Sequence, residues 1–425
     1  MKGDAVGDAA ATGPDQVEVR ERTISARGRD VSLFIVAGEH SGDALGAKLM
    51  AALNQGRGGR VRYLGVGGPQ MAAQGLVSLF PLEDVAVMGP VAIAARFPQI
   101  LSRVYRTVSA AATAEPDAVI IIDSPEFTHP IAKRIRRRCP NIPIIDYVSP
   151  SVWAWRPGRA RKMREYIDHV LALWPFEPEA HKRLGGPPCS FVGHPLIERH
   201  PWIAALDPAP LAERLGLAKD APVLVVLPGS RSSEVSRMMP PFGAALAVML
   251  ARGRKFEVVM PVMSSVRPLI EQHLKAWPQQ PHLVEGEEDK FRAFKLAKAA
   301  LAASGTVTLE LALAGTPMVV GYKVDVIIAP VLRRLIIAPS VVLPNLVLDE
   351  RVFPEFHQET CTASNFADAL EPLLDDSPQR SRQLDALARI PAALQVVGHA
   401  PSEAAASIVL EYAENGRGWP RRTAT

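Results

Sequence analysis

The sequence predicts an α/β protein with two Rossmann-like domains, each a doubly wound parallel sheet, that face each other across a cleft. Short, continuous apolar runs alternate with helical stretches along most of the chain. Such runs are typical of parallel strands that helices cover on both faces. The alternation stops and restarts near residues 205–220, and glycine or polar residues follow most of the runs.

The first half contains a series of predicted strands separated by helical stretches. The apolar run at residues 31–38 leads into "EHSGD" and then into a predicted helix over residues 44–53. The run at residues 61–68 repeats this pattern of a strand followed by glycine. Further strands are predicted within residues 117–127, 142–155, 169–177 and 189–196.

The second half repeats the alternation of strand and helix, starting with the apolar residues of "VLVVLPGSR". A final helix is predicted over residues 401–415, with Ser402 as its N-cap after Pro401. The other strands are predicted within residues 256–264, 282–286, 299–305 and 317–322. We therefore divide the chain into a flexible leader, an N-terminal domain, a C-terminal domain and a C-terminal helical segment, at residues 1–30, 31–212, 213–385 and 386–425.

The composition is that of a folded, mildly basic protein. Of its 425 residues, 48% are hydrophobic and 22% are charged, and the formal net charge is +4. This balance suits a phosphate-bearing ligand or an anionic membrane surface without requiring either. The three cysteines form no CxxC pair, so we expect a reducing compartment, no disulfide framework and no zinc site. We expect no secretory signal and no membrane span, because no apolar run is long enough.

Polar residues that follow the predicted strands should converge on one cleft. The carboxyl ends of parallel strands meet at one edge of a sheet, and ligands of open α/β sheets bind there. The candidates of the first half are Glu39, Ser41, Gly42, Asp43 and Asp123, and those of the second half are Ser230, Arg231, Ser304, Gly305, Thr306 and Glu310.

Ser304, Gly305 and Thr306 stand between a predicted strand and a predicted helix. The first N–H groups of a helix are unpaired and carry a partial positive charge, and these small residues leave room for an anion. We interpret the stretch as a pyrophosphate site, with Glu310 one turn further on able to accept two ribose hydroxyls. The alternative is a capped helix with a solvated Glu310.

A second candidate anion site is the loop "LPGSR" before the next predicted helix. Gly229 and Ser230 let the backbone approach a ligand, and Arg231 could clamp a phosphate with two hydrogen bonds. The alternative is a surface pair between Arg231 and Glu234. The loop matches neither a P-loop nor GxGxxG, which disfavours an ATPase or an NAD enzyme. No Asp-x-Asp occurs in the chain, so we expect no metal and no cofactor.

Taken together, the motifs resemble the lipid-A-disaccharide synthase family. The resemblance is carried, between about Leu33 and Asn345, by "VAGEHSGD", "GVGGPQM", "VMGPVAI", "IDSPEF", "YVSPSVWAWRPGR", "LPGSRSSEV", "ASGTVTLELALAGTPMVVGYK" and "LPN". It implies a GT-B glycosyltransferase, peripheral on the cytoplasmic face of the Gram-negative inner membrane. The implied donor is UDP-2,3-diacylglucosamine and the implied acceptor is 2,3-diacylglucosamine 1-phosphate. The products would be UDP and a β-1,6-linked disaccharide 1-phosphate, and homodimers with exchanged C-terminal parts can form.

An α-linked donor and a β-linked product imply a single inverting displacement. It needs a base for the attacking 6-hydroxyl and positive charge for the leaving UDP. Asp123 ends the apolar run "AVIII", so partial burial would raise its pKa toward that of a useful base. The alternative is an Asp that caps the turn before Pro125. Asp43 and Glu39 are the rival bases, although either could cap the following helix.

On this interpretation residues 31–212 bind the lipid acceptor and residues 213–385 bind the UDP-sugar. Arg231 and the helix start at Gly305 would receive the diphosphate. Asn345, in "VLPNLV", could contact donor or acceptor, or could be a turn residue after Pro344.

Two further stretches bear on the partners. "WAWRPGRARKMR", residues 153–164, could be a phosphate or membrane contact, or two core tryptophans with a solvated basic helix. Because it lies at a strand end inside an α/β frame, we expect no nucleic-acid partner. Residues 87–108 place arginines beside an apolar helical face formed by Val91, Ala94, Ala95, Pro98, Leu101 and Val104. They suit an interfacial helix or an ordinary amphipathic helix.

Two other functions are compatible with the fold. One is a GT-B transferase or an epimerase that acts on another UDP-sugar, which would have no use for the apolar segment at residues 87–108. The other is a two-domain ligand receptor without catalysis, which would bind its ligand without releasing UDP.

Overall fold

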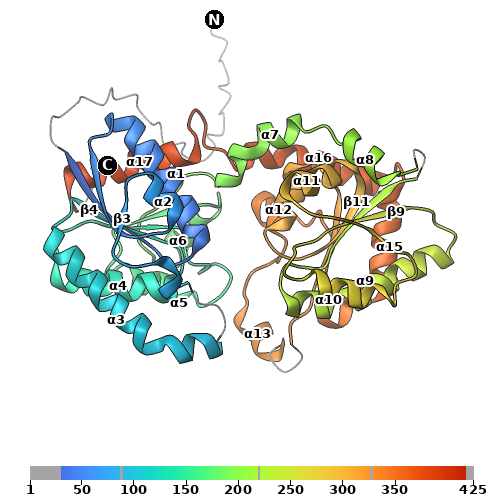
Figure 1. Ribbon diagram of the computed structural model, residues 1–425, viewed down its shortest axis with the longest axis horizontal. Helices are drawn as coiled ribbons and strands as arrows, with labels where there is room; N and C mark the ends of the chain where they lie inside the picture. The colour runs from blue at the N-terminus through green and yellow to red at the C-terminus, as the bar shows by residue number, and fades with distance from the viewer. Residues whose placement is uncertain (1–29, 87–89, 219–220, 326–328, 418–425) are drawn as a thin grey trace, which may run out of the picture.

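The structure, a computed structural model, describes residues 30–86, 90–218, 221–325 and 329–417. It shows two α/β domains that lie side by side, each with a parallel sheet between layers of helices (Figure 1). This confirms the predicted fold class of two doubly wound parallel-sheet domains. The predicted leader, residues 1–30, lies outside the described residues except for Asp30.

The first domain is built on a seven-stranded parallel sheet in the order β3-β2-β1-β4-β5-β6-β7. Its strands are β1 (Val31–Ala37), β2 (Val61–Val66), β3 (Val77–Ser78), β4 (Ala118–Ile122), β5 (Ile144–Tyr147), β6 (His169–Ala172) and β7 (Cys189–Phe191). The chain moves outward from β1 to β3, then returns to the other side of β1 for β4. The winding direction therefore reverses between β1 and β4, where α/β sheets open a crevice.

The second domain repeats this plan with a six-stranded parallel sheet in the order β10-β9-β8-β11-β12-β13. Its strands are β8 (Val223–Leu227), β9 (Glu257–Pro261), β10 (His282–Val284), β11 (Ala297–Ala303), β12 (Met318–Tyr322) and β13 (Glu355–His357). Here the direction reverses between β8 and β11. The edge strands β3 and β13 were not predicted, because each has only one apolar residue, whereas the equally short β7 and β10 each have two.

Helices cover both faces of each sheet. Those of the first domain are α1 (His40–Arg57), α2 (Pro69–Ala73), α3 (Pro90–Ala114), α4 (Pro125–Arg138), α5 (Gly158–Met163) and α6 (Glu177–Arg183). The connection contains α7 (His200–Ala205) and α8 (Ala209–Leu215). Those that follow are α9 (Ser232–Ala251), α10 (Arg267–Leu274), α11 (Glu287–Leu296), α12 (Val307–Leu313), α13 (Ala329–Leu335), α14 (Leu343–Leu348), α15 (Ala363–Leu374), α16 (Pro378–Ala393) and α17 (Pro401–Asn415). Short 3-10 turns lie at Leu82–Asp84, Pro195–Arg199 and Gln358–Thr360.

The core of each domain lies on both faces of its sheet, which explains why the strands are apolar throughout. All five residues of β4 are buried. Ile120 and Ile122 pack into the cluster on one face, and Val119 and Ile121 pack into the cluster on the other. Burying one such side chain contributes about 1.5–3 kcal/mol. If apolar and polar residues alternated along the strand, the cluster on one face of the sheet would lose the apolar side chains that the strand contributes to it.

The chain returns to the first domain at its C-terminus. Helix α16 packs in the second domain, whereas α17 packs against α1 and places Val409 and Tyr412 in the core of the first domain. The predicted start of the C-terminal segment, residue 386, falls inside α16. The predicted N-cap Ser402 is wrong, because α17 begins at Pro401 and the carboxylate of Glu403 accepts the N–H of Ala400 at 3.1 Å.

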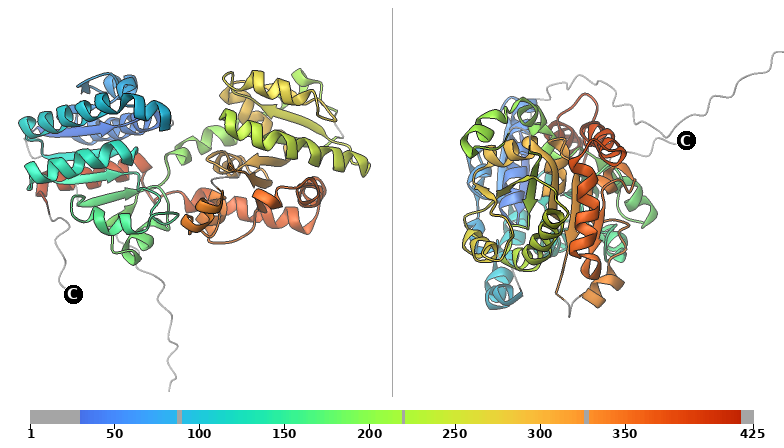
Figure 2. Two further views of the ribbon diagram at one scale, coloured as in Figure 1. Left: turned by 90° about the horizontal axis from the view of Figure 1, so that it is seen from below. Right: turned by 90° about the vertical axis from the view of Figure 1, so that its right-hand side faces the viewer.

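Two connections join the domains, one through α7 and one between α16 and α17 (Figures 1 and 2). The predicted boundary between residues 212 and 213 falls within α8. The carboxyl edges of the sheets face each other, since the loop after β5 contacts the segment after β12. There the N–H of Ile337 donates to the carbonyl oxygen of Ala154 at 2.7 Å.

Candidate functional site

The crevice between β1 and β4 brings together three of the predicted site residues. Glu39 and Ser41 follow β1, and Asp123 follows β4. The Ser41 hydroxyl donates to Glu39 Oε1 at 2.7 Å and lies 3.4 Å from Asp123 Oδ2. Asp123 Oδ1 accepts the N–H of Ser124 at 2.7 Å. The long contact with Ser41 leaves Oδ2 able to accept a proton from a ligand.

The backbone at Asp123 is strained. Asp123 and Ser124 both adopt left-handed conformations, with φ of 52° and 45°. Consecutive non-glycine residues in this region are uncommon, and such strain gathers at functional sites. Gly38 makes the close approach possible, because a Cβ on it would lie 2.5 Å from the Cβ of Ser124. This geometry supports the interpretation of Asp123 as a functional residue.

Burial and the neighbouring Glu39 raise the pKa of the Asp123 carboxyl to about 6. Burial has the largest effect, and the N–H of Ser124 acts in the opposite direction. A carboxylate with a pKa near 6 is charged at neutral pH and more basic than an ordinary aspartate, which suits a general base.

Asp43, the rival base, has a different environment. Its side chain is buried in the first turn of α1. Oδ1 accepts the N–H groups of Gly68 and Met71 at 2.8 and 3.0 Å, and Oδ2 accepts that of Gln70 at 3.0 Å. Asp43 thus anchors the start of α2, and its oxygens are less accessible to a substrate than those of Asp123. The helix starts earlier than predicted, at His40, and Gly42 is buried beside β4.

At the second reversal point, Gly229, Ser230 and Arg231 follow β8. Gly229 has φ of 120°, and a Cβ there would lie 2.4 Å from the Cβ of Glu234, so the turn requires glycine. Arg231 precedes α9 directly, and its Nη1 donates to Glu234 Oε1 at 2.9 Å. Glu234 Oε2 accepts the N–H of Ser230 at 3.0 Å. The predicted pair with Glu234 is therefore present, while the exposed guanidinium keeps other donors for a ligand.

Ser304, Gly305 and Thr306 lie beside this loop, between β11 and α12, in the predicted order of strand, turn and helix. The space where a Cβ of Gly305 would point is open. The N–H groups of Thr308 and Leu309 donate to the carbonyl oxygens of Gly305 and Thr306 at 3.1 and 3.0 Å, so the N–H groups available to an anion are those that precede Thr308. The Ser304 hydroxyl donates to the carbonyl oxygen of Val341 at 2.7 Å, so it braces the neighbouring segment.

The structure adds a partner for Glu310 that sequence reasoning missed. Lys290, on α11, donates to both carboxylate oxygens of Glu310 at 2.9 Å. The pair is partly buried and orients the carboxylate. Nothing in the stretch "EGEEDKFRAF" distinguishes Lys290 from a solvated lysine, so only the contact between α11 and α12 identifies it.

Asn345 is buried, and its amide is used within the protein. Oδ1 accepts the N–H groups of Val352 and Phe353 at 3.0 Å, and Nδ2 donates to the carbonyl oxygen of Phe353 at 2.9 Å. These bonds brace the turn after α14, which is the structural role left open by the sequence. A contact of Asn345 with donor or acceptor stays a prediction.

The tryptophans of residues 153–164 have separate environments. Trp153 donates to the buried Glu177 at 3.1 Å and packs edge-on against Phe176. Trp155 forms an isolated bridge with Ile336 of the second domain, and the Arg156 guanidinium lies 4.2 Å from the centre of its ring. The stretch therefore contributes to the contact between the domains.

Helix α3 presents an exposed apolar stripe. Phe97, Leu101 and Tyr105 lie four residues apart and are 58%, 37% and 56% exposed. Val104, which we expected on this face, is buried, and the helix continues through Pro98. The side chains of Val91, Ala94 and Ala95 lie outside the described residues.

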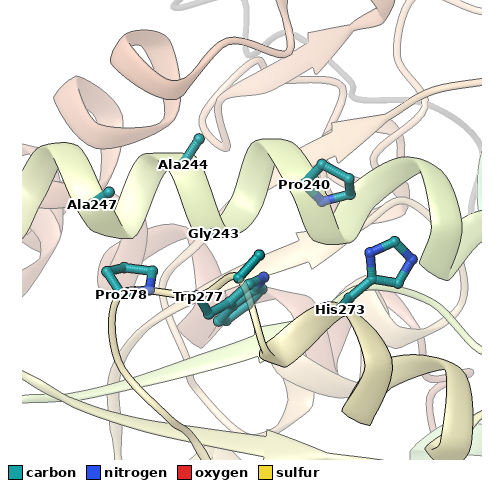
Figure 3. A pocket seen from close by; sticks show the side chains of 8 residues that line it. Pro240, Gly243, Ala244, Ala247, His273, Trp277 and Pro278 are labelled. Carbon is teal, nitrogen blue, oxygen red and sulfur yellow. The ribbon is translucent and has the colours of Figure 1, made fainter.

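A separate hollow of about 360 Å³ lies between α9 and α10, away from both reversal points (Figure 3). Pro240, Ala244 and Trp277 give it an apolar wall, and His273 is its one titratable side chain. A Cβ on Gly243 would lie 2.5 Å from Trp277 Nε1, so the ring packs tightly on the helix. This hollow holds no group suited to a phosphate.

Within the described residues, no helix combines the length and apolar character needed to cross a bilayer. No three His, Cys, Asp or Glu side chains gather as metal ligands in the part of the chain that the structure describes. The absence of a metal from the reaction stays a prediction.

Comparison with known proteins identifies the relatives of this chain. The family described as lipid-A-disaccharide synthetase matches residues 33–409. A lipid-A-disaccharide synthase of Rhodopseudomonas palustris strain BisB18 is 53% identical over 378 residues, which cover 89% of this chain and 94% of the relative. That of Nitrobacter hamburgensis is 50% identical over 386 residues, which cover 91% and 96%.

Solved structures share the architecture at low identity. UDP-GlcNAc 2-epimerase of Neisseria meningitidis, bound to UDP-GlcNAc, has a TM-score of 0.57 at 12% identity, covering 91% of this chain and all of the epimerase (100%). MurG of Acinetobacter baumannii has a TM-score of 0.54 at 12% identity, covering 90% and 99%. At such identities the likeness establishes the fold, which is of the GT-B type.

Proposed function

The chain belongs to the lipid-A-disaccharide synthase family and is a glycosyltransferase; on this premise we propose its substrates and the roles of its residues. It transfers 2,3-diacylglucosamine from UDP-2,3-diacylglucosamine to the 6-hydroxyl of 2,3-diacylglucosamine 1-phosphate. The observation that supports this most is the arrangement at the two reversal points. One carries a carboxylate of raised pKa, and the other carries an arginine loop beside an open helix start.

The first domain supplies the base in this proposal. Asp123 Oδ2 accepts the proton of the acceptor's 6-hydroxyl as its oxygen attacks the anomeric carbon of the donor. The bond from that carbon to the diphosphate breaks, and UDP leaves with the electron pair. One displacement on an α-linked donor gives a β-linked product, with inversion. Glu39, Ser41 and Gly42 shape the acceptor side, where the Ser41 hydroxyl donates to Glu39 and lies beside Asp123.

The second domain binds the donor in this proposal. The leaving diphosphate gains charge in the transition state, and Arg231 with the Ser230 hydroxyl and the N–H groups at Gly305 and Thr306 stabilises that charge. Glu310, oriented by Lys290, accepts the ribose hydroxyls. No step requires a metal, since an arginine and a helix start supply the positive charge.

The test is release of UDP from the diacylated donor, measured with and without the acylated acceptor phosphate. We expect rapid release with the acceptor present and a β-1,6-linked product. An epimerase would instead isomerise a UDP-sugar or release UDP without an acceptor, and a receptor would bind the donor and release none. Either result would contradict the proposed transfer.

Turnover is expected to persist without divalent metal, because the proposed charge stabilisation uses only protein groups. The measurement is the initial rate after extensive treatment with EDTA. A loss of activity that Mg²⁺ restores would show that a metal takes part.

We also propose peripheral attachment to the cytoplasmic face of the inner membrane through α3. The acceptor and donor are lipids, and the stripe of Phe97, Leu101 and Tyr105 is bordered by exposed Arg96 and Arg106. Such a surface suits the interface of an anionic bilayer. Homodimer formation stays a prediction, and in the structure α17 packs on its own chain.

The double variant Phe97→Ser, Leu101→Ser is expected to bind anionic vesicles on the order of tenfold more weakly, because less apolar surface enters the bilayer. Added salt should weaken the binding of the wild type. The control is Val397→Ser, which removes an exposed apolar side chain outside α3. Unchanged binding of the double variant would place the membrane contact elsewhere.

A further inference from the structure

An open groove of about 520 Å³ lies between α4 and α5 in the first domain. These helices follow β4 and β5, which are adjacent strands of the sheet. The groove begins at Pro125, two residues after Asp123, and its far wall is Tyr166. The groove therefore starts near the carboxyl edge of the sheet, close in sequence to the proposed base, and extends along α4 and α5 toward the amino end of β6.

The groove carries an excess of positive charge. Lys133, Arg156, Arg159 and Lys162 line it, against the single carboxylate of Glu126. Arg159 donates to Glu126 at 2.8 Å, and this contact holds the pKa of the Glu126 carboxyl below its ordinary value. One ion pair therefore accounts for only one of the four cations.

The other three cations form no salt bridge with a carboxylate among the described residues, although Arg156 also attracts Glu126 over a longer distance. The Lys133 ammonium lies 4.9 Å from the centre of the Tyr166 ring, and Arg156 lies over Trp155. These aromatic faces hold the cations in place without using their N–H donors. Lys162 is exposed at the rim. Three cations without a salt bridge on one concave surface favour a ligand with more than one negative charge.

We propose that this groove binds the phosphate monoester of the sugar acceptor and so positions the acceptor's hydroxyl at Asp123. The inference rests on the proposed function. A sugar 1-phosphate carries its dianion at one end of the ring and its 6-hydroxyl at the other. Lys133, Arg156 and Lys162 contact the phosphate oxygens, while Arg159 is oriented toward the groove by Glu126. The UDP of the donor is bound by the opposite domain, so the two anions do not compete.

The proposal predicts a coupling between the three cations and the acceptor phosphate. The test compares kcat/KM for the phosphorylated acceptor and for the same diacylated sugar without phosphate, in neutral detergent micelles. Each of Lys133→Gln, Arg156→Gln and Lys162→Gln is expected to lower kcat/KM for the phosphorylated acceptor about three- to tenfold, through KM. The loss with the dephosphorylated acceptor is expected to be much smaller, and the KM for the donor should be unaffected.

Matched controls are Arg137→Gln on α4 and Arg161→Gln on α5, which remove exposed cations from the same helices outside the groove. In each control variant, kcat/KM should change by the same factor for the phosphorylated and the dephosphorylated acceptor. Equal losses with both acceptors in the groove variants would overturn the phosphate subsite. If the groove variants lose kcat/KM only on anionic vesicles, the cations bind a lipid headgroup, and this result would also overturn the phosphate subsite. A wild-type enzyme that transfers to neither acceptor would instead contradict the proposed function itself.

Discussion

The Asp123→Asn variant is expected to lower kcat by about 10²–10⁴-fold while donor affinity changes little. Asn keeps the shape of the side chain and cannot accept the proton of the attacking hydroxyl. The proposed contacts to UDP lie in the other domain, so the donor should still bind. The measurements are kcat with both substrates and the Kd of UDP.

The pH profile gives a second test of the same residue. A base must be deprotonated, and the pKa of the Asp123 carboxyl is raised to about 6. For the wild type, kcat/KM is therefore expected to fall as the pH drops below about 6, tenfold per unit. The residual activity of Asp123→Asn should lack this limb. A wild-type profile that stays flat down to pH 4 would assign the proton transfer to another group.

Loss of folding is not expected to explain the loss of rate. The folded-state pKa of about 6 lies above the ordinary value of 3.8, so the charged carboxylate costs folding free energy above pH 6. That cost, at most about 3 kcal/mol, disappears as the pH falls toward 4. At pH 7 Asn has no charge to bury, and its Tm should be no lower than that of the wild type.

The matched control is Asp117→Asn, the same substitution at the opposite end of β4. Asp117 Oδ2 accepts the N–H of Ser32 at 2.9 Å, away from the carboxyl edge of the sheet. This variant is expected to keep kcat and to change only stability. If Asp123→Asn turns over normally, or loses donor affinity instead of rate, the assignment of the base is wrong. Asp43 then becomes the next candidate.

The Arg231→Ala variant is expected to lower turnover about a hundredfold, or about 3 kcal/mol of transition-state stabilisation. Arg231 follows β8, and the turn at Gly305 follows the adjacent strand β11, so both loops lie at the same edge of the sheet. The single side-chain bond of Arg231 to Glu234 leaves donors for the diphosphate. Because charge grows on the leaving group, the loss should fall mainly on kcat, with a smaller change in donor KM.

Arg252→Ala provides the control for Arg231. Arg252 follows the last turn of the same helix, where it pairs with Asp368 and Glu371. Its replacement removes an equal charge at the far end of α9 and is expected to keep turnover near that of the wild type. A folded Arg231→Ala protein with a normal rate would remove Arg231 from the donor site.

The local pattern of apolar residues predicted the longer strands and helices well. Apolar runs such as those of β1 and β4 are recognisable because every residue is buried between two helical layers. Glycine at position 229 marks a turn because a Cβ there would clash with Glu234, which lies only five residues further along the chain. Edge strands β3 and β13 were missed because each has only one apolar residue, and Ser402 was misplaced as a cap because α17 begins one residue earlier, at Pro401.

The sequence by itself determined the order of strands and helices, the division into two domains, and the polar residues at the strand ends. Neighbouring residues decide these properties. Only the tertiary structure decided how those polar residues are used. It places Ser41 between Glu39 and Asp123, occupies both oxygens of Asp43, pairs Lys290 with Glu310, and gathers three cations without salt bridges beside α4. Each depends on contacts between residues far apart in the chain, and those contacts set burial, charge and access.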